Sequence, residues 1–135
     1  SIFDRTIEQN GLKETAVRLN KSIIAFSPLA QGLLTNRYLN GIPEDSRIRT
    51  DGRFLKESVI TEEKLAQIRA LNEIAAARGQ TLAEMALAWI LKDGQVTSVL
   101  IGASRPEQIL DDLKALDNTA FTPDELRAID AASGF

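Results

Sequence analysis

The turn at residues 102–108 carries the strongest chemical signal in the sequence. Ser104 precedes Glu107 by three residues, which is the spacing of a capping box at the start of a helix. A helix N-terminus offers unpaired backbone N–H groups and a partial positive charge, and both suit a phosphate. Arg105 would lie in the first turn, where a cation opposes the helix dipole at a cost of about 0.3–1 kcal/mol. A bound anion would reverse that cost, because a guanidinium can grip phosphate through two hydrogen bonds; alternatively, Ser104 only caps the helix and Arg105 is solvated.

A second candidate is the stretch Phe26–Gly32, where the chain leaves an apolar segment. Ser27 follows that segment directly, and the polar Gln31 and the flexible Gly32 come close behind. A plain turn at the end of a strand explains the same residues, so this alternative stays open. Neither turn matches the glycine fingerprint of a classical dinucleotide fold or a Walker-type phosphate loop.

The stretch from about Ala30 to Ile60 has little periodicity, which in a compact domain is typical of a functional loop. Between Asn36 and Lys56 it has a net charge of +2, from five basic and three acidic residues, whereas the rest of the chain carries −5. The basic residues are Arg37, Arg47, Arg49, Arg53 and Lys56. A basic loop that follows a buried parallel strand is placed where α/β folds bind anionic ligands.

Other groups that could do chemistry are scarce. The chain has no histidine and no cysteine, which removes the commonest general base, disulfides and thiolate metal sites. For Tyr38, the only tyrosine, we expect a packing or surface role, and for Trp89 a place in the core. The acidic pairs at 62–63 and 111–112 are interpreted as helix charges, and no metal-site spacing is present.

The 135 residues suffice for one domain with a sizeable core, and 44% hydrophobic and 26% charged residues argue against disorder. A net charge of −3 gives no reason to expect nucleic acid or an anionic membrane as partner. The longest apolar run, Met85 to Leu91, is too short to cross a bilayer, and no export signal is visible, so a cytoplasmic protein is expected. The chain begins at Ser1, and Ile2-Phe3 reads like the end of a buried strand, so we expect further sequence upstream.

Helical and strand-like patterns alternate, which indicates an α/β fold with a parallel sheet. Buried strands are expected at 23–26 and 96–101, and a first helix with its apolar stripe at Leu12, Ala16 and Leu19. Four further helices begin at cap residues and present apolar stripes. These caps are Thr61, Thr81 with Glu84, Ser104 with Glu107, and Thr122 with Glu125; the third helix has its stripe at Ile109, Leu110, Leu113 and Leu116.

Three segments together resemble the aldo-keto reductases, in the branch of the potassium-channel β-subunits and bacterial glyceraldehyde-3-phosphate reductases. They are 26–38 with 41–43 and 46–47, then 81–91, and then 99–108. The resemblance covers nearly the whole chain and implies a (β/α)8 TIM barrel, of which residues 1–135 would form the C-terminal, cofactor-binding part of one domain. Strand six would end at Ile2-Phe3, strand seven would be 23–26 and strand eight 97–101. Open parallel edges lead us to expect that this part does not fold stably by itself.

The resemblance also implies an NADP(H) site and its residues. Ser27, Pro28, Leu29 and Gln31 would line the pyrophosphate and nicotinamide side, and Arg37 and Arg47 the loop that folds over the pyrophosphate. Gly102, Ser104, Arg105 and Gln108 would hold the adenosine 2′-phosphate, which favours NADP over NAD. Asp111 and Asp112 stand at the adenine positions, where the family usually has Glu and Asn, and Asn36 replaces a usual glycine.

The family's catalytic aspartate, tyrosine, lysine and histidine come from the first half of the barrel, and none is matched here. The resemblance implies that the complete protein transfers hydride from NADPH to the carbonyl of a small aldehyde or ketone. This chain alone would be inactive, and a homo-oligomer stays open. The alternative is a regulatory or sensor subunit that binds NADP(H) with little turnover.

Overall fold

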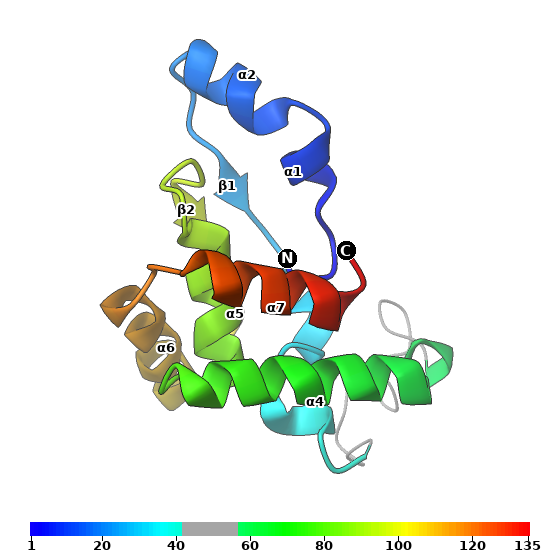
Figure 1. Ribbon diagram of the computed structural model, residues 1–135. Coiled ribbons are helices and arrows are strands. Elements are labelled where there is room, and N and C mark those ends of the chain that lie inside the picture. Colours follow the sequence, from blue (N-terminus) through cyan, green and yellow to red (C-terminus); the bar gives the residue numbers. More distant parts are fainter. Residues whose placement is uncertain (42–56) are drawn as a thin grey trace.

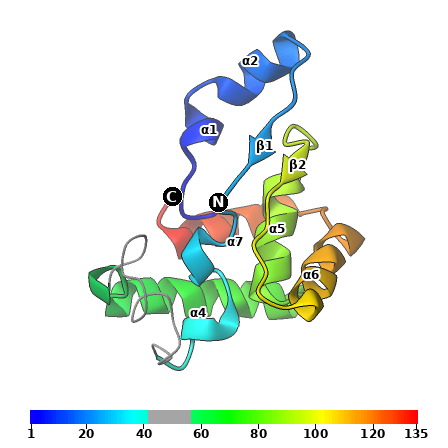
Figure 2. The same cartoon turned by 180° about the vertical axis from the view of Figure 1, so that it is seen from behind.

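The computed structural model describes residues 1–41 and 57–135. The helices are α1 (Thr6–Gln9), α2 (Leu12–Arg18), α4 (Glu62–Ala77), α5 (Leu82–Leu91), α6 (Pro106–Leu113) and α7 (Pro123–Ser133). The strands are β1 (Ile24–Ala25) and β2 (Ser98–Val99), and short 3-10 helices are η1 (Ala30–Gly32), η2 (Asn36–Tyr38), η3 (Glu57–Val59) and η4 (Lys114–Asp117). Helices α4, α5 and α7 pack together, while α2 projects beyond the two strands and α1 lies between α2 and the helical core (Figures 1 and 2). None of the described helices is long and apolar enough to cross a membrane.

The two strands pair in parallel, with Ile24 opposite Ser98 and Ala25 opposite Val99. They are shorter than the sequence predicts, although the Leu100 N–H still donates to the Ala25 carbonyl at 2.8 Å. Their predicted burial is wrong on one face, because no described element covers it: Ile24 is 62% exposed.

The expected strand end at Ile2-Phe3 is also wrong. These residues form a turn, closed by a 3.1 Å hydrogen bond from the Asp4 N–H to the Ser1 carbonyl. No described strand lies beside them, and a strand needs such a partner for its backbone hydrogen bonds. Ile2 is nevertheless fully buried in the core.

Three of the four predicted caps form as expected. The Thr81 hydroxyl accepts from the Glu84 N–H, and the Glu84 carboxylate accepts from the Thr81 N–H at 2.9 Å. Thr122 and Glu125 make the same reciprocal pair at the start of α7. The Thr61 hydroxyl accepts from the N–H of the third residue of α4 at 3.1 Å. These contacts satisfy backbone donors that a helix start would otherwise leave unpaired.

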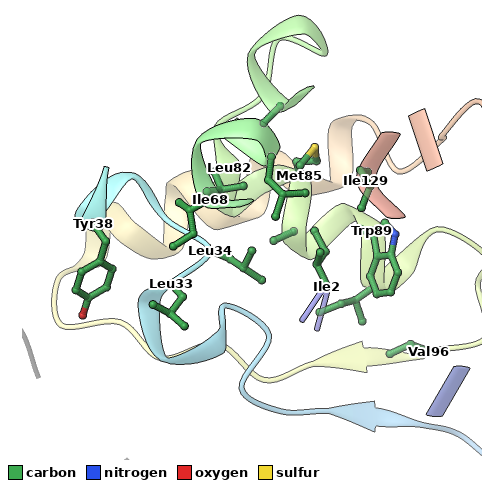
Figure 3. Packing of buried hydrophobic residues seen from close by; sticks show 14 residues of the cluster. Ile2, Leu33, Leu34, Tyr38, Ile68, Leu82, Met85, Trp89, Val96 and Ile129 are labelled. Carbon is green, nitrogen blue, oxygen red and sulfur yellow. The ribbon is translucent and has the colours of Figure 1, made fainter. Parts of the chain in front are cut away.

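The core lies between α4, α5, α7 and the segment around η1 and η2. Figure 3 shows Leu34, Met85 and Ile129 converging there from different elements. Trp89 is buried as predicted, at 4% exposure, but its Nε1–H has no acceptor among the described residues. Tyr38 is also buried, which confirms the expected packing role.

An ion cluster ties the projecting helices to the core. The Lys13 ammonium, on a residue that is 2% exposed, lies 2.9 Å from Glu8 and 2.5 Å from Asp93. Burial favours the neutral form of Glu8, but the hydrogen bonds from Lys13 and Lys92 outweigh it and lower the pKa of that carboxyl. At Asp93 burial also favours the neutral carboxyl, but interactions led by the hydrogen bond from Lys13 outweigh burial and lower the pKa. This paired charge fixes the start of α2 against the end of α5.

Two predicted apolar stripes are exposed rather than buried. Of the three stripe residues predicted for the first helix, which is α2, only Ala16 is buried, whereas Leu12 and the C-cap residue Leu19 face solvent. The second stripe is exposed throughout, at Ile109, Leu110 and Leu113 of α6 and at Leu116 of η4. Both stripes are amphipathic as predicted, but the described residues provide no surface that packs against them.

Candidate functional site

The turn after β1 holds three non-glycine residues in left-handed backbone conformations. The φ angles are +51° at Ser27, +47° at Ala30 and +60° at Gln31. Each such residue costs about 1–2 kcal/mol relative to a right-handed one, because its Cβ crowds the following carbonyl. Backbone hydrogen bonds close the turn, from Ala30 N–H to the Ser27 carbonyl at 3.1 Å and from Gly32 N–H to the Leu29 carbonyl at 2.9 Å. A fold that maintains such a turn against local preference marks a candidate functional site.

The turn after β2 is organised by the side chain of Gln108. Its Oε1 accepts three hydrogen bonds: from Ser104 N–H at 2.8 Å, from Ser104 Oγ–H at 3.1 Å and from Arg105 N–H at 3.2 Å. The predicted capping box of Ser104 with Glu107 is therefore wrong. Arg105 is the N-cap residue and Pro106 the first helical residue, which suits the fixed φ of proline. The amide oxygen of Gln108 thus lies where the sequence predicts an anion.

The two turns line one groove of about 710 Å³. Eight of the twelve predicted site residues are part of its wall: Ser27, Pro28, Leu29, Gln31, Arg37, Gly102, Ser104 and Gln108. The first five follow β1 and the last three follow β2, so residues about 75 positions apart in the chain share one site. The parallel pairing of the strands explains this, because it places both strand ends at the same edge of the sheet.

Three predicted residues lie outside the groove wall, and a fourth, Arg47, lies outside the described residues. Arg105 is exposed at the N-cap of α6, next to Ser104 of the wall. Asp111 is further along α6 and pairs with Lys114 at 2.8 Å. Burial, followed by the charges of Asp111 and Glu84, raises the pKa of Asp112.

Six residues that line the groove were not among the predicted site residues: Phe26, Gly32, Tyr38, Leu100, Ile101 and Ala103. The signal for Leu100 and Ile101 was available, since both lie at the end of a predicted parallel strand, where ligands bind in α/β folds. Tyr38 carried no such signal, because its position depends on how η2 folds back onto the core.

The groove wall combines polar and apolar side chains. Its polar lining residues include Ser27, Gln31, Arg37, Ser104 and Gln108, and they lie beside apolar residues of both turns. The Gln31 Nε2–H donates to Ser27 Oγ at 3.4 Å, a long hydrogen bond that links two of these groups. Apolar residues combined with placed polar groups are typical of small-molecule and cofactor sites.

The model of the Aldo/keto reductase family matches residues 1–133. The chain belongs to the aldo-keto reductase family. It is 50% identical over 133 residues to the L-glyceraldehyde 3-phosphate reductase of Escherichia coli O157:H7, covering 96% of this chain and 38% of that protein. It is 40% identical over 114 residues to a putative voltage-gated potassium channel subunit beta of Schizosaccharomyces pombe, covering 82% of this chain and 33% of that protein.

Two solved structures share its fold. The glycerol dehydrogenase of Gluconobacter oxydans matches with a TM-score of 0.75 and 28% identity over 97% of this chain and 39% of that one. A thermostable aldo-keto reductase in complex with the inhibitor epalrestat matches with a TM-score of 0.61 and 27% identity, over 97% and 36%. The predicted fold class, α/β and the C-terminal portion of a (β/α)8 barrel, is confirmed. The chain spans less than two fifths of the length of these relatives, and they place it in a family of oxidoreductases.

Proposed function

We propose that the protein is an NADP(H)-dependent oxidoreductase that reduces the carbonyl group of small aldehydes or ketones. In this proposal residues 1–135 supply the cofactor-binding part of one barrel domain and none of the catalytic residues, so the chain alone is inactive. The supporting observation is the single groove that joins the two turns, because eight residues chosen from the sequence line it together.

The residues of the groove fit a dinucleotide. A volume of about 710 Å³ lies within the usual range of cofactor pockets. We assign Ser27, Pro28, Leu29 and Gln31 to the pyrophosphate and nicotinamide side, with Arg37 and Arg47 near the pyrophosphate. We assign Gly102, Ser104, Arg105 and Gln108 to the adenosine 2′-phosphate, and Asp111 and Asp112 to the adenine. The cofactor, when bound, supplies the hydride, and this chain's residues bind and orient it.

The hydrogen bonds of Gln108 bear on the 2′-phosphate assignment. Its neutral amide oxygen accepts hydrogen bonds from the N–H and hydroxyl of Ser104 and from the N–H of Arg105. A dianionic phosphate competes well for these donors, since hydrogen bonds to a charged group are about twice as strong as neutral ones. The Arg105 guanidinium adds a positive charge beside the same donors.

The groove can be blocked without disturbing the fold. Gly102 lines it, and a Cβ added there would meet no other atom within 4 Å. We expect Gly102→Leu to abolish NADPH binding and carbonyl reduction in the full-length protein, with an unchanged melting temperature. Ala128→Leu, on the exposed side of α7, is the matched control and should bind NADPH normally. Normal NADPH binding by Gly102→Leu, measured by fluorescence titration, would place the cofactor elsewhere.

A second candidate function is that of an NADP(H)-binding regulatory or sensor subunit with little turnover. It is supported by the 40% identity to a putative potassium channel subunit beta. Single-turnover and steady-state rates with small aldehydes distinguish the two functions: a sensor binds NADPH in the same groove but oxidises it very slowly. A cytoplasmic location completes the proposal, and cell fractionation checks it.

A further inference from the structure

A second pocket, of about 250 Å³, lies between α1, the end of α5 and α7, and it shares no residue with the groove. We call it the Trp89 pocket, because the indole of that residue forms part of its wall. We propose that the Trp89 pocket binds a small α-amino acid with an apolar side chain. The proposal does not depend on the NADP(H) assignment, because the two sites are built from different residues.

The Trp89 pocket and the groove lie toward opposite ends of β2. Trp89 and Lys92 are at the end of α5, from which the chain enters β2 at Ser98. The groove is lined by residues that follow β2, from Leu100 onward. A ligand in the Trp89 pocket consequently leaves the groove free.

The Trp89 pocket contains a buried hydrogen-bond donor that has no acceptor. Trp89 is 4% exposed, and its Nε1–H has no partner among the described residues. Figure 3 shows the nitrogen edge of the indole turned toward Ile129 of α7, and the α7 residues Leu126 and Asp130 line the pocket. An unpaired buried donor is unfavourable, so most such groups have a partner in native structures. The missing partner is an acceptor oxygen, which a ligand in this pocket can supply.

Two cations lie over the same indole ring. The Arg5 guanidinium carbon is 4.8 Å from the ring centroid of Trp89, and the Lys92 ammonium is 3.8 Å from it. Lys92 donates one of its three N–H bonds to Glu8 Oε1, at 3.0 Å. Arg5 donates three of its five N–H bonds, to Ile2, Asp130 and Ser133. Burial lowers the pKa of Lys92, and Glu8 only partly offsets this, so the ammonium is poorly hydrated. The spare donors of both cations, together with the indole N–H, therefore favour a ligand carboxylate.

The charges of the wall indicate that the ligand is a zwitterion. Arg5 and Lys92 are balanced by Glu8 and Asp130, so the lining residues carry no net charge. A plain carboxylate would leave one negative charge uncompensated in a half-enclosed pocket, which is unfavourable. In each acidic side chain only one oxygen accepts a hydrogen bond from a described residue, so the other oxygen can accept from a ligand ammonium group.

The size and the apolar surface of the pocket favour a short apolar side chain on the amino acid. Leu126, Trp89 and Phe135 supply the apolar surface. A cavity of about 150 Å³ takes benzene, so about 250 Å³ accommodates roughly ten non-hydrogen atoms. Leucine has this size, whereas a nucleotide is too large.

The test uses the full-length protein with isotope-labelled tryptophan indole nitrogens. The Trp89 resonance in NMR spectra is assigned by its loss in Trp89→Phe. We expect L-leucine to shift this resonance saturably, with a Kd of about 1 mM. Two analogues of similar shape separate the charges: isocaproate lacks the ammonium group, and isoamylamine lacks the carboxylate. Each should bind at least about tenfold more weakly than L-leucine, because each leaves charged partners in the wall unpaired.

A substitution at the edge of the Trp89 pocket can block it without removing a contact. Gln9 lines the pocket and is exposed, and its side chain makes no hydrogen bond to a described residue. Gln9→Phe should abolish the shift caused by L-leucine and leave the melting temperature unchanged. Thr15→Phe, at an exposed neutral residue of α2 outside the pocket wall, is the matched control and should bind L-leucine normally.

Three results would overturn the proposal. A Trp89 resonance that none of the three ligands shifts would show that water is the acceptor. Either analogue bound as tightly as L-leucine would show that the pocket recognises a single charge and not a zwitterion. L-leucine binding that survives Gln9→Phe would locate the amino acid outside the pocket. Gly102→Leu, which blocks the groove, should leave L-leucine binding unchanged, so a failure of the proposed function is distinguishable from a failure of this site.

Discussion

Replacing Arg105 with alanine should change cofactor affinity and fold stability in opposite directions. Arg105 is the exposed N-cap residue of α6, where its positive charge faces the positive end of the helix dipole. If the site holds a 2′-phosphate, Arg105 contributes a charge-assisted contact to NADPH and none to NADH, whose ribose carries a hydroxyl there. Arg105→Ala should therefore weaken the binding of NADPH and leave the affinity for NADH almost unchanged.

The magnitudes follow from exposure. A hydrogen bond to a charged group contributes about 1.5–3 kcal/mol, and solvent around Arg105 reduces this to the lower end. We expect a loss of about 1.4 kcal/mol for NADPH, which is about tenfold in Kd. Without ligand, removal of the cation from the helix N-terminus should raise the free energy of unfolding by about 0.3 kcal/mol. Both effects should fade at high salt.

The assay is isothermal titration of the full-length protein with NADPH and NADH, together with urea unfolding of the free protein. Arg127→Ala is the matched control, since Arg127 is an exposed arginine of α7 that pairs with Asp124, away from the groove. It should leave both affinities unchanged. Equal weakening of NADPH and NADH by Arg105→Ala would refute the assignment of the 2′-phosphate.

Three further outcomes follow from the described contacts. Gln108→Ala should lower the free energy of unfolding by about 1 kcal/mol in urea titrations, because it frees the backbone donors at the start of α6; no loss would show that water satisfies them equally well. Lys13→Met should lower the free energy of unfolding by about 2 kcal/mol at neutral pH, less than for a fully buried ion pair because Glu8 and Asp93 are partly exposed. Because the pKa values of these carboxyls are lowered in the folded state, the carboxyls stabilise the fold at pH values above their unfolded pKa and lose this contribution as the pH falls. The difference in the free energy of unfolding between Lys13→Met and wild type should therefore shrink below about pH 4. A constant difference down to pH 3 would contradict this. Trp89→Phe should lower the free energy of unfolding by less than the about 3 kcal/mol of a large core truncation, because it also removes an N–H that has no acceptor among the described residues, and thermal unfolding measures the change.

The site illustrates which predictions depend on local chemistry. Ser27, Gln31, Gly102 and Ser104 were chosen from strand-end turns and family motifs, and the parallel pairing brings them together. The capping box at Ser104 was wrong, although the S-x-x-E pattern is present. The helix begins at Pro106, so Gln108 is its third residue. The Gln108 side chain accepts the backbone hydrogen bonds at the helix start that were expected to be met by Glu107.

The exposed stripes show a different limit. Periodicity correctly indicated that Leu12 lies on an apolar face of one helix and that Leu110 and Leu113 lie on an apolar face of another. It could not indicate what would cover these faces. Burial depends on a partner surface, and the described residues contain none for these faces. The same reason explains why Ile24, which pairs with Ser98 of β2, and Phe26, which follows β1, remain exposed.

By itself, the sequence determined the helix starts at Thr61, Thr81 and Thr122, the parallel α/β pattern and the family. The caps depend on contacts that span three residues, so they form wherever the local pattern occurs. Only the tertiary structure decided that the turns at 27–32 and 102–108 share one groove, and that Gln108 occupies the donors expected to meet an anion. It also decided which strand face is covered, because burial requires that residues far apart in the chain meet.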